Sequence, residues 1–241
     1  MGYIIRPLTI AKIHASKGIF TYLIDYDKEI VVPCNLWYIE GPKEKIIVDT
    51  GCSAEGIKRH GFMAEDIQSI EEALNKVNLK PEDVNIVLVT HLHFDHIGYA
   101  YKFPNAKFIV QEDELKYAFS PHIAYSTPFE KGMFINLRLY PVRGDQTITE
   151  GVRVLHTPGH TPGGQSIAVD TDKGTAIITG FCSIMDNFKP PKELHGVFPV
   201  LMPGIHYDLF KLYDSIMRVK GLADIIVPLH DPKIATKTKI P

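Results

Sequence analysis

Four side chains that can bind a metal ion fall within six residues, at His91, His93, Asp95 and His96. They follow an apolar run at residues 84–90 that has the composition of a buried strand. A strand end is a rigid support on which ligand geometry can be held. His91 and His93 can converge on one ion, and Asp95 with His96 on a second, so the stretch predicts a two-metal site. A histidine-rich surface turn is the alternative, but it does not explain the buried strand.

A further candidate ligand, His160, lies in a loop with two Pro-Gly steps, at 158–159 and 162–163. Two such steps fix a sharp loop and place His160 at its apex, which favours a ligand over a chance surface residue. His230 lies just beyond a last predicted strand at residues 224–227. The sequence does not mark the remaining histidines of this half of the chain as ligands: His122, His156, His195 and His206.

The chain has three cysteines, Cys34, Cys52 and Cys182, too few and too odd in number for a disulfide framework. Such sparse use fits a reducing compartment, where one thiolate can serve a metal. Asp49, at the end of a predicted strand, has two possible roles. It either supports a ligand histidine or hydrogen-bonds within its own turn.

Composition excludes several classes of function. The 241 residues fit one large domain, 1–241, and the net charge is −2 with 26 basic and 28 acidic residues. No basic stripe is present, which argues against nucleic acid as a partner. No apolar run is long enough for a membrane span, and the N-terminus lacks a signal-peptide pattern. We therefore expect a cytoplasmic protein with a small-molecule substrate, and the sequence leaves a homodimer open.

The periodicity of the chain predicts strands that alternate with helices. An antiparallel meander opens the chain, with two strands around Gly18 within residues 4–26 and a turn at 40–43. The further predicted strands are at 34–39, 45–48, 84–90, 107–110, 147–149, 152–156, 166–169, 175–179 and 224–227, and the helices at 64–78, 112–119 and from Asp208 to 219. Residues 120–131 break this pattern and are either a lid over the site or an irregular surface connection.

The pattern His91-x-His93-x-Asp95-His96, then His160 in a Thr-Pro-Gly-His loop, then His230, resembles the metallo-β-lactamase superfamily. Val48-Asp49-Thr50-Gly51 matches another motif of that superfamily, and the likeness runs from about Trp37 to Asp231. The resemblance implies an α/β fold: a four-layer αββα sandwich of two mixed sheets, with the metals at one edge.

Within the superfamily the chain is most similar to N-acyl-homoserine lactonases, with two departures. Phe181 stands where those enzymes carry a bridging Asp, and Ile184 stands where they carry a Tyr that contacts the substrate. Some true metallo-β-lactamases supply a cysteine thiolate from this same strand end. Cys182 is therefore either a replacement ligand for the second metal or a buried free thiol.

The resemblance implies a metal-dependent hydrolase that attacks the carbonyl of an ester or lactone. His91, His93 and His160 would hold one metal, and Asp95, His96 and His230 the other, which Cys182 would join if it is a ligand. Asp95 would also carry the proton. Zinc is the expected ion, as one or two per chain, with iron or manganese as alternatives. The rival functions are a glyoxalase II-like thioesterase, an iron-dependent oxidoreductase and a noncatalytic metal-binding protein.

Overall fold

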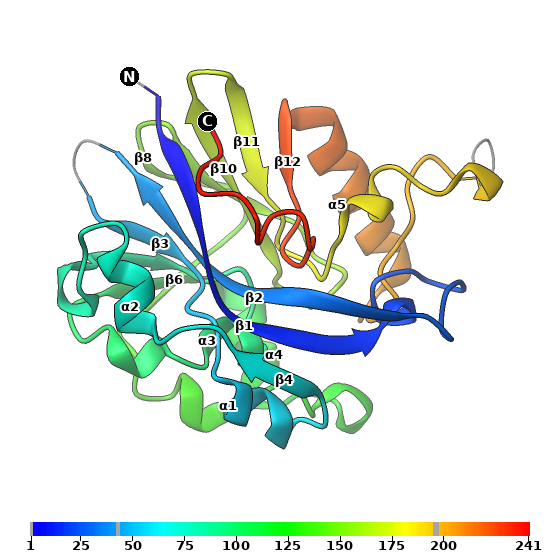
Figure 1. Cartoon of the computed structure of the whole chain (residues 1–241), viewed down its shortest axis with the longest axis horizontal. Helices are drawn as coiled ribbons and strands as arrows, with labels where there is room; N and C mark the ends of the chain where they lie inside the picture. The colour runs from blue at the N-terminus through cyan, green and yellow to red at the C-terminus, as the bar shows by residue number, and fades with distance from the viewer. Residues whose placement is uncertain (1, 42–43, 195–197) are drawn as a thin grey trace.

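The computed structural model describes residues 2–41, 44–194 and 198–241. Part of the predicted turn at 40–43, and His195, lie outside the described residues. The described strands form two mixed sheets that pack face to face, with helices on both outer faces (Figure 1). The predicted four-layer αββα architecture is therefore confirmed.

The first sheet has the strand order β4-β1-β2-β3-β5-β6-β7. Its strands are β1 (Ile4–Ser16), β2 (Glu29–Glu40), β3 (Ile46–Val48), β4 (Met63–Asp66), β5 (Ile86–Leu88), β6 (Lys107–Gln111) and β7 (Leu139–Val142). The second sheet, ordered β12-β11-β10-β9-β8, contains β8 (Gln146–Thr149), β9 (Val152–His156), β10 (Gln165–Thr171), β11 (Gly174–Ile178) and β12 (Ile225–Val227).

The helices are short apart from the last one. They are α1 (Ala54–Arg59), α2 (Ile70–Asn75), α3 (Phe94–Ile97), α4 (Glu112–Phe119) and α5 (Leu209–Leu222). Single 3₁₀ turns occupy Lys17–Ile19, Pro81–Asp83, Ala100–Lys102, Ile123–Tyr125, Lys131–Met133, Met185–Asn187 and Lys192–Leu194. None of these described helices has the length and apolar composition that crossing a bilayer requires.

Three apolar layers hold the sandwich together. Between the sheets, Trp37 and Val48 of the first sheet share a buried cluster with Ile167 and Ile178 of the second. The outer face of the first sheet packs on α2 and α4, and the outer face of the second packs on α5 through Leu212, Ile216 and Val219. Figure 1 shows α5 beside β12 and the helices α1, α2 and α4 on the opposite side.

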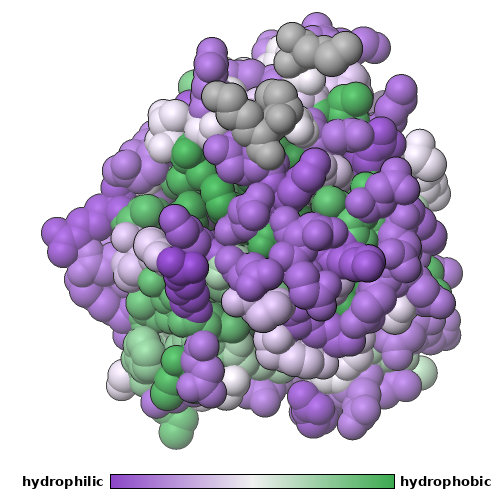
Figure 2. Space-filling view, turned by 90° about the vertical axis from the view of Figure 1, so that its left-hand side faces the viewer, coloured by the Kyte–Doolittle hydropathy of each residue, from purple (hydrophilic) through white to green (hydrophobic). Residues whose placement is uncertain are grey.

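The surface that covers these layers is mostly polar. Figure 2 shows the face at the left of Figure 1, where hydrophilic side chains predominate and hydrophobic ones show between them in separate patches. That division between a polar surface and an apolar interior is the one expected when burial of apolar side chains drives folding.

Strand direction brings the predicted site residues to one edge of the sandwich. The strands β3, β5, β6 and β7 run parallel, so the segments that leave their carboxyl ends emerge on the same side. Asp49 follows β3 and His91 follows β5. In the second sheet β11 and β12 are also parallel, which places Cys182 and His230 beyond neighbouring strand ends.

The helix predicted over residues 64–78 is wrong in its first part. Met63–Asp66 is strand β4, paired antiparallel with β1, and the helix begins only at Ile70. Ser69 is the reason, because its side chain accepts from the backbone N–H of Glu72 while the Glu72 carboxylate accepts from the N–H of Ser69. This reciprocal cap fixes the first turn of the helix and leaves the preceding residues free to pair with β1.

The predicted second strand after Gly18 is also wrong. The strand β1 is one continuous element of 13 residues, and a 3₁₀ turn at Lys17–Ile19 ends it. The Ser16 hydroxyl accepts from Gly18 N–H, and Lys17 binds the carboxylates of Asp25 and Asp186. Sequence reasoning also missed helix α1 and strand β7. Ser53, whose side chain accepts from Gly56 N–H, was the signal available for α1.

The substitution Ser69→Ala tests the cap that starts α2. We expect it to lower the free energy of unfolding by about 1 kcal/mol, because the Glu72 N–H loses its acceptor. Ser120→Ala is the matched control, since the structure gives the Ser120 hydroxyl no hydrogen bond among the described residues. Urea unfolding of both variants measures the difference, and equal midpoints would contradict the role of Ser69.

Candidate metal centre

His91 and His93 leave the end of β5 in a loop that is buried on all sides. His91 is completely buried and His93 is 5% exposed. His93 also precedes the short helix α3, whose first turn presents Asp95 and His96. One strand end thus supplies four of the predicted ligands, because the chain passes from an extended loop into a helical turn between His93 and Asp95.

His160 arrives from the second sheet, in the loop between β9 and β10. Gly159 before it has φ +127°, and a Cβ at this position would lie 2.2 Å from the backbone nitrogen of Leu212 in α5. The loop is fixed there because Ser215 donates its hydroxyl to the carbonyl of Pro158. Gly159 therefore lets the loop come close to α5, and a residue with a side chain at this position would not.

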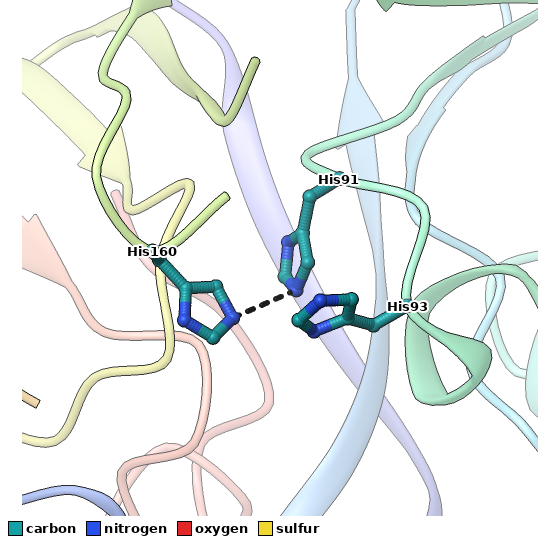
Figure 3. A group of neighbouring side chains, drawn as sticks. All are labelled: His91, His93 and His160. Carbon is teal, nitrogen blue, oxygen red and sulfur yellow. Dashed lines mark hydrogen bonds between the residues drawn. The ribbon is translucent and has the colours of Figure 1, made fainter. Parts of the chain in front are cut away.

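The structure brings His91, His93 and His160 together, although they come from two different sheets (Figure 3). One ligand nitrogen from each lies within 4.8 Å of the others, and the Nε2 atoms of His91 and His160 are 3.2 Å apart. The Nε2 of His93 is buried and has no hydrogen-bond partner among the described residues. A buried polar atom without a partner is costly, and a metal ion would satisfy all three nitrogens.

Hydrogen bonds at the opposite ring nitrogens assign the protons. Nδ1 of His160 donates to the carbonyl of Ile205 at 2.9 Å, which leaves Nε2 as the unprotonated atom. Nδ1 of His91 is 3.0 Å from the Thr90 hydroxyl, which itself donates to Asp49. Both Nε2 atoms therefore present lone pairs to the same space, the arrangement that a metal ligand requires.

A second group lies beside the first and consists of Asp95, His96 and His230. The carboxylate of Asp95 is 3.4 Å from Nε2 of His96 and 3.7 Å from Nε2 of His230. Nδ1 of His230 donates to the carbonyl of Pro33 at 3.1 Å, so its Nε2 also faces the group with a lone pair. Two sets of three ligand atoms thus adjoin one another.

Burial and neighbouring charges set the protonation of the two groups. Burial, together with the nearby imidazoles, holds the pKa of His91 and of His93 well below the ordinary value near 6.5. Burial likewise lowers the pKa of His160 and of His230 to about 4. These four histidines are therefore neutral near pH 7, which is the form that binds metal.

Asp95 and His96 behave differently because they face each other. Burial alone would raise the pKa of Asp95, but the adjacent histidines, His96 foremost, lower it well below its usual range. Burial would lower the pKa of His96, yet the carboxylates of Asp95 and Asp49 raise it to about 10. Without a metal, this pair is therefore a carboxylate beside an imidazolium.

Asp49 supports both groups, which favours the first of its two predicted roles. Its carboxylate accepts from the backbone N–H of Thr90, from the Thr90 hydroxyl and from Nδ1 of His96, each at 2.7 Å. The residue is fully buried and has φ +54°, a left-handed conformation that is uncommon outside glycine. It holds the His96 ring directly and the His91 ring through Thr90.

The two groups line a cavity of about 90 Å³. Apart from the six candidate ligands and Cys182, the lining is entirely apolar: Ile13, Ala15, Ile19, Phe20, Val32, Phe62, Phe94, Pro128 and Ile205. None of the described lining residues is Lys, Arg, Ser, Thr or Tyr. Among the described lining residues, polar side chains therefore lie only in the two candidate ligand groups and at Cys182.

Phe181 and Cys182 point to different sides of the chain. Phe181 is fully buried in the cluster under α5, with its ring 6.2 Å from that of Phe188. Cys182 lines the cavity, but its Sγ belongs to neither three-ligand group among the described residues. Burial, and then the charge of Asp95, raise the pKa of the Cys182 thiol well above its ordinary value. Its role as a ligand stays a prediction.

Residues 120–131 cover the first group. The rings of Tyr125 and Phe129 stand edge-on to His93, and the Tyr125 hydroxyl donates to the carbonyl of His160 at 2.8 Å. The backbone N–H of Phe94 donates to the carbonyl of Pro128. The segment thus contacts both ligand loops, which are the loop that carries His91 and His93 and the loop that carries His160. Its opening as a lid stays a prediction. The sequence does not mark three further described histidines as ligands, and all three lie outside the two groups: His122, His156 and His206.

A family model for the metallo-beta-lactamase superfamily matches residues 30–219. The chain belongs to the metallo-beta-lactamase superfamily. The N-acyl homoserine lactonase AttM of Azorhizobium caulinodans is 31% identical over 236 residues, which cover 86% of this chain and 84% of that protein. An N-acyl homoserine lactonase of a Bacillus species is 32% identical over 161 residues, 61% of this chain. This chain spans only 62% of the length of that Bacillus protein.

Solved structures confirm the superfamily fold. A quorum-quenching N-acyl homoserine lactone hydrolase superposes with a TM-score of 0.81 at 24% identity, and the match covers 98% of this chain and 95% of that one. The dizinc quorum-quenching lactonase AidC superposes with a TM-score of 0.67 at 18% identity, over 98% of this chain and 89% of that one. At these identities the likeness concerns the fold.

The substitution Cys182→Ala distinguishes the two readings of this thiol. If Cys182 is a ligand, the variant should bind the second metal more weakly and the first unchanged, because only the second site loses a donor. Cobalt-loaded wild type should then show a near-ultraviolet thiolate-to-cobalt charge-transfer band that the variant lacks. A wild type without the band, or a variant that keeps it, would identify Cys182 as a buried thiol.

Proposed function

We propose that the chain is a single-domain, metal-dependent hydrolase that opens a small lactone or cleaves a small ester. One observation carries this proposal: two adjoining sets of three candidate ligands, five of them buried and Asp95 partly buried, face one apolar cavity. A scaffold that buries five such groups beside a partly buried carboxylate, without a use for them, would lose stability for no gain. The lactonase relatives support the choice of a cyclic ester.

Zinc is the ion that this ligand set fits best, with iron or manganese as alternatives. Nitrogen ligands suit zinc, and neutral imidazoles already face the first position. When bound, such an ion would lower the pKa of a coordinated water far below that of bulk water, to about 7, which would provide hydroxide at neutral pH. His91, His93 and His160 would hold one ion, and Asp95, His96 and His230 the other.

Asp95 is the residue we assign to proton transfer. Its carboxylate is charged at neutral pH, because the neighbouring histidines hold its pKa well below the usual range. A carboxylate at this place can orient the attacking water and accept its proton. It can then return that proton to the alkoxide oxygen released when the carbonyl–oxygen bond breaks.

The lining of the cavity and the ligand sets support an ester or lactone as the substrate over the rival functions, which substrate profiling would separate. A thioesterase of the glyoxalase II kind acts on an anionic thioester, yet no described lining residue carries a positive side chain apart from the ligand histidines. An iron-dependent oxygenase keeps open positions beside a two-histidine, one-carboxylate set. Here His93 and His230 complete two fuller sets. An uncharged ester or lactone fits the apolar wall better than either rival.

Metal analysis combined with a substrate screen tests the proposal. Purified protein refilled with zinc should hold up to two ions per chain and hydrolyse at least one uncharged lactone or ester. Substituting His91 or His160 should empty the first site. Wild-type protein that retains no metal by elemental analysis would refute the proposal, and metal without activity in a broad screen would favour the noncatalytic alternative.

Asp95→Asn should lower kcat by roughly 100-fold or more, the scale for loss of a general base. The amide keeps the shape of the carboxylate but loses its charge and its capacity to take a proton. Circular dichroism should report an unchanged fold, because Asp95 lies in the first turn of a short helix at the edge of the sandwich. Steady-state kinetics measure the effect, and near-normal turnover would remove Asp95 from the mechanism.

N-acyl-homoserine lactones should be poorer substrates than alkyl-substituted lactones with side chains of equal length. Ile184, at the position of the lactonase Tyr, is buried and does not line the cavity, and none of the described lining residues has a hydroxyl side chain. The amide of the acyl chain would therefore lose hydrogen bonds to water without replacement. The ratio of kcat/KM for each matched pair measures this, and efficient turnover of the acyl-homoserine lactones would contradict it.

A further inference from the structure

Glu114 is a fully buried carboxylate that the proposed reaction does not use. It lies in the first turn of α4, directly after β6. No salt bridge joins it to a cation among the described residues, and burial raises its pKa above the ordinary value. A charged group placed at such cost needs a compensating role.

Both oxygens of Glu114 accept hydrogen bonds from backbone groups of the two ligand loops. Oε1 accepts from the N–H of Leu92 at 2.9 Å, and Oε2 accepts from the N–H of Gly163 at 3.0 Å. Leu92 stands between His91 and His93, and Gly163 lies three residues after His160. A single carboxylate therefore joins the loop of the first sheet to the loop of the second.

Gly163 shows independently that this approach is close. A Cβ on Gly163 would lie 2.1 Å from the backbone nitrogen of Glu114 and 2.5 Å from its Cβ. Only a residue without a side chain lets the loop that carries His160 come this near to α4. Gly163 makes room for the contact, and Glu114 provides the hydrogen bonds.

We propose that Glu114 is a positioning residue that holds the His91–His93 loop and the His160 loop at the separation needed for one metal ion. The proposal rests on the proposed metal site. The three ligands of the first group are divided between these two loops, and nothing covalent fixes the distance between them. The second group takes no ligand from the His160 loop. Loss of the bridge therefore acts on the first ion.

The substitution Glu114→Gln tests the bridge with little change of shape. A carboxamide has one accepting oxygen, so either Leu92 N–H or Gly163 N–H would face an NH₂ group. We expect the dissociation constant for the first equivalent of cobalt to rise about 10- to 100-fold, the usual effect of losing a group that orients metal ligands. Chelator competition, read from the visible cobalt spectrum, measures this without any substrate.

Two further variants separate positioning from general stability. Gly163→Ala pushes the loops apart from the other side and should weaken cobalt binding in the same way, which keeps the test open if Glu114→Gln does not fold. Ser69→Ala is the control, because it removes the cap of α2 and so weakens the fold, while the hydrogen bonds of the Ser69 side chain go to Glu72 alone among the described residues. It should lower the melting temperature of the metal-free protein and leave cobalt affinity unchanged.

The possible results distinguish the two proposals. Wild type that binds no cobalt overturns the proposed function, and this inference with it. Wild type that binds cobalt, beside folded Glu114 and Gly163 variants that bind it as tightly, overturns the positioning role alone. An equal loss of affinity in Ser69→Ala also overturns that role, because the effect would then follow from a weakened fold.

Discussion

The contact on which the structure depends is the approach of two imidazole rings, His91 and His160, with unprotonated Nε2 atoms 3.2 Å apart. Two lone pairs at this distance repel unless a cation lies between them. The rings come from loops of different sheets, so local chain geometry cannot hold them together. Everything around them opposes their separation: buried hydrogen bonds, a close glycine contact and the packing of both sheets.

The layered core of the sandwich keeps the loops that carry His91 and His160 from moving apart. Apolar side chains between the sheets fix one sheet against the other, and the parallel strands deliver the ligand loops to a common edge. Asp49 then orients two ligand rings within the first sheet, and Gln165 joins the sheets by donating to the carbonyls of Val89 and Ile109. Buried polar networks of this kind fix one geometry because each unpaired member would be costly.

Local sequence patterns predict some of the helices and strands but not others. The sequence predicts the helix at 112–119, the strand pair β8–β9 and the strand pair β10–β11 within two residues at each end. Apolar periodicity and turn residues mark these elements directly. The apolar spacing at 64–78 does not mark where the helix begins, because the Ser69 cap fixes its first residue at Ile70. Strand β7 was missed, because its short, partly exposed sequence has no clear alternation.

The residues of the site also divide into those that the sequence marks and those that it does not. The six histidine and aspartate candidates stood out by type and spacing, and the structure gathers them into two groups. The residues that support them did not stand out. Glu114 is separated by 22 and 49 residues from the backbone groups it binds, and Asp49 by 47 residues from His96. A contact of that kind depends on how strands are ordered in the sheets, which no local pattern encodes.

The two ligand groups differ in charge, and this makes the two metal positions chemically unequal. The first group consists of neutral imidazoles whose low pKa values already favour the metal-binding form. The second contains the Asp95 carboxylate, which His96 balances by keeping its own proton, since its pKa is about 10 without a metal. A cation can enter the first group without displacing a proton, whereas at neutral pH it must release one from His96 to enter the second. In the proposed two-metal site, the second position would therefore bind more weakly as the pH falls, and the Phe181 side chain, turned away into the core, would add no bridging charge to offset that difference.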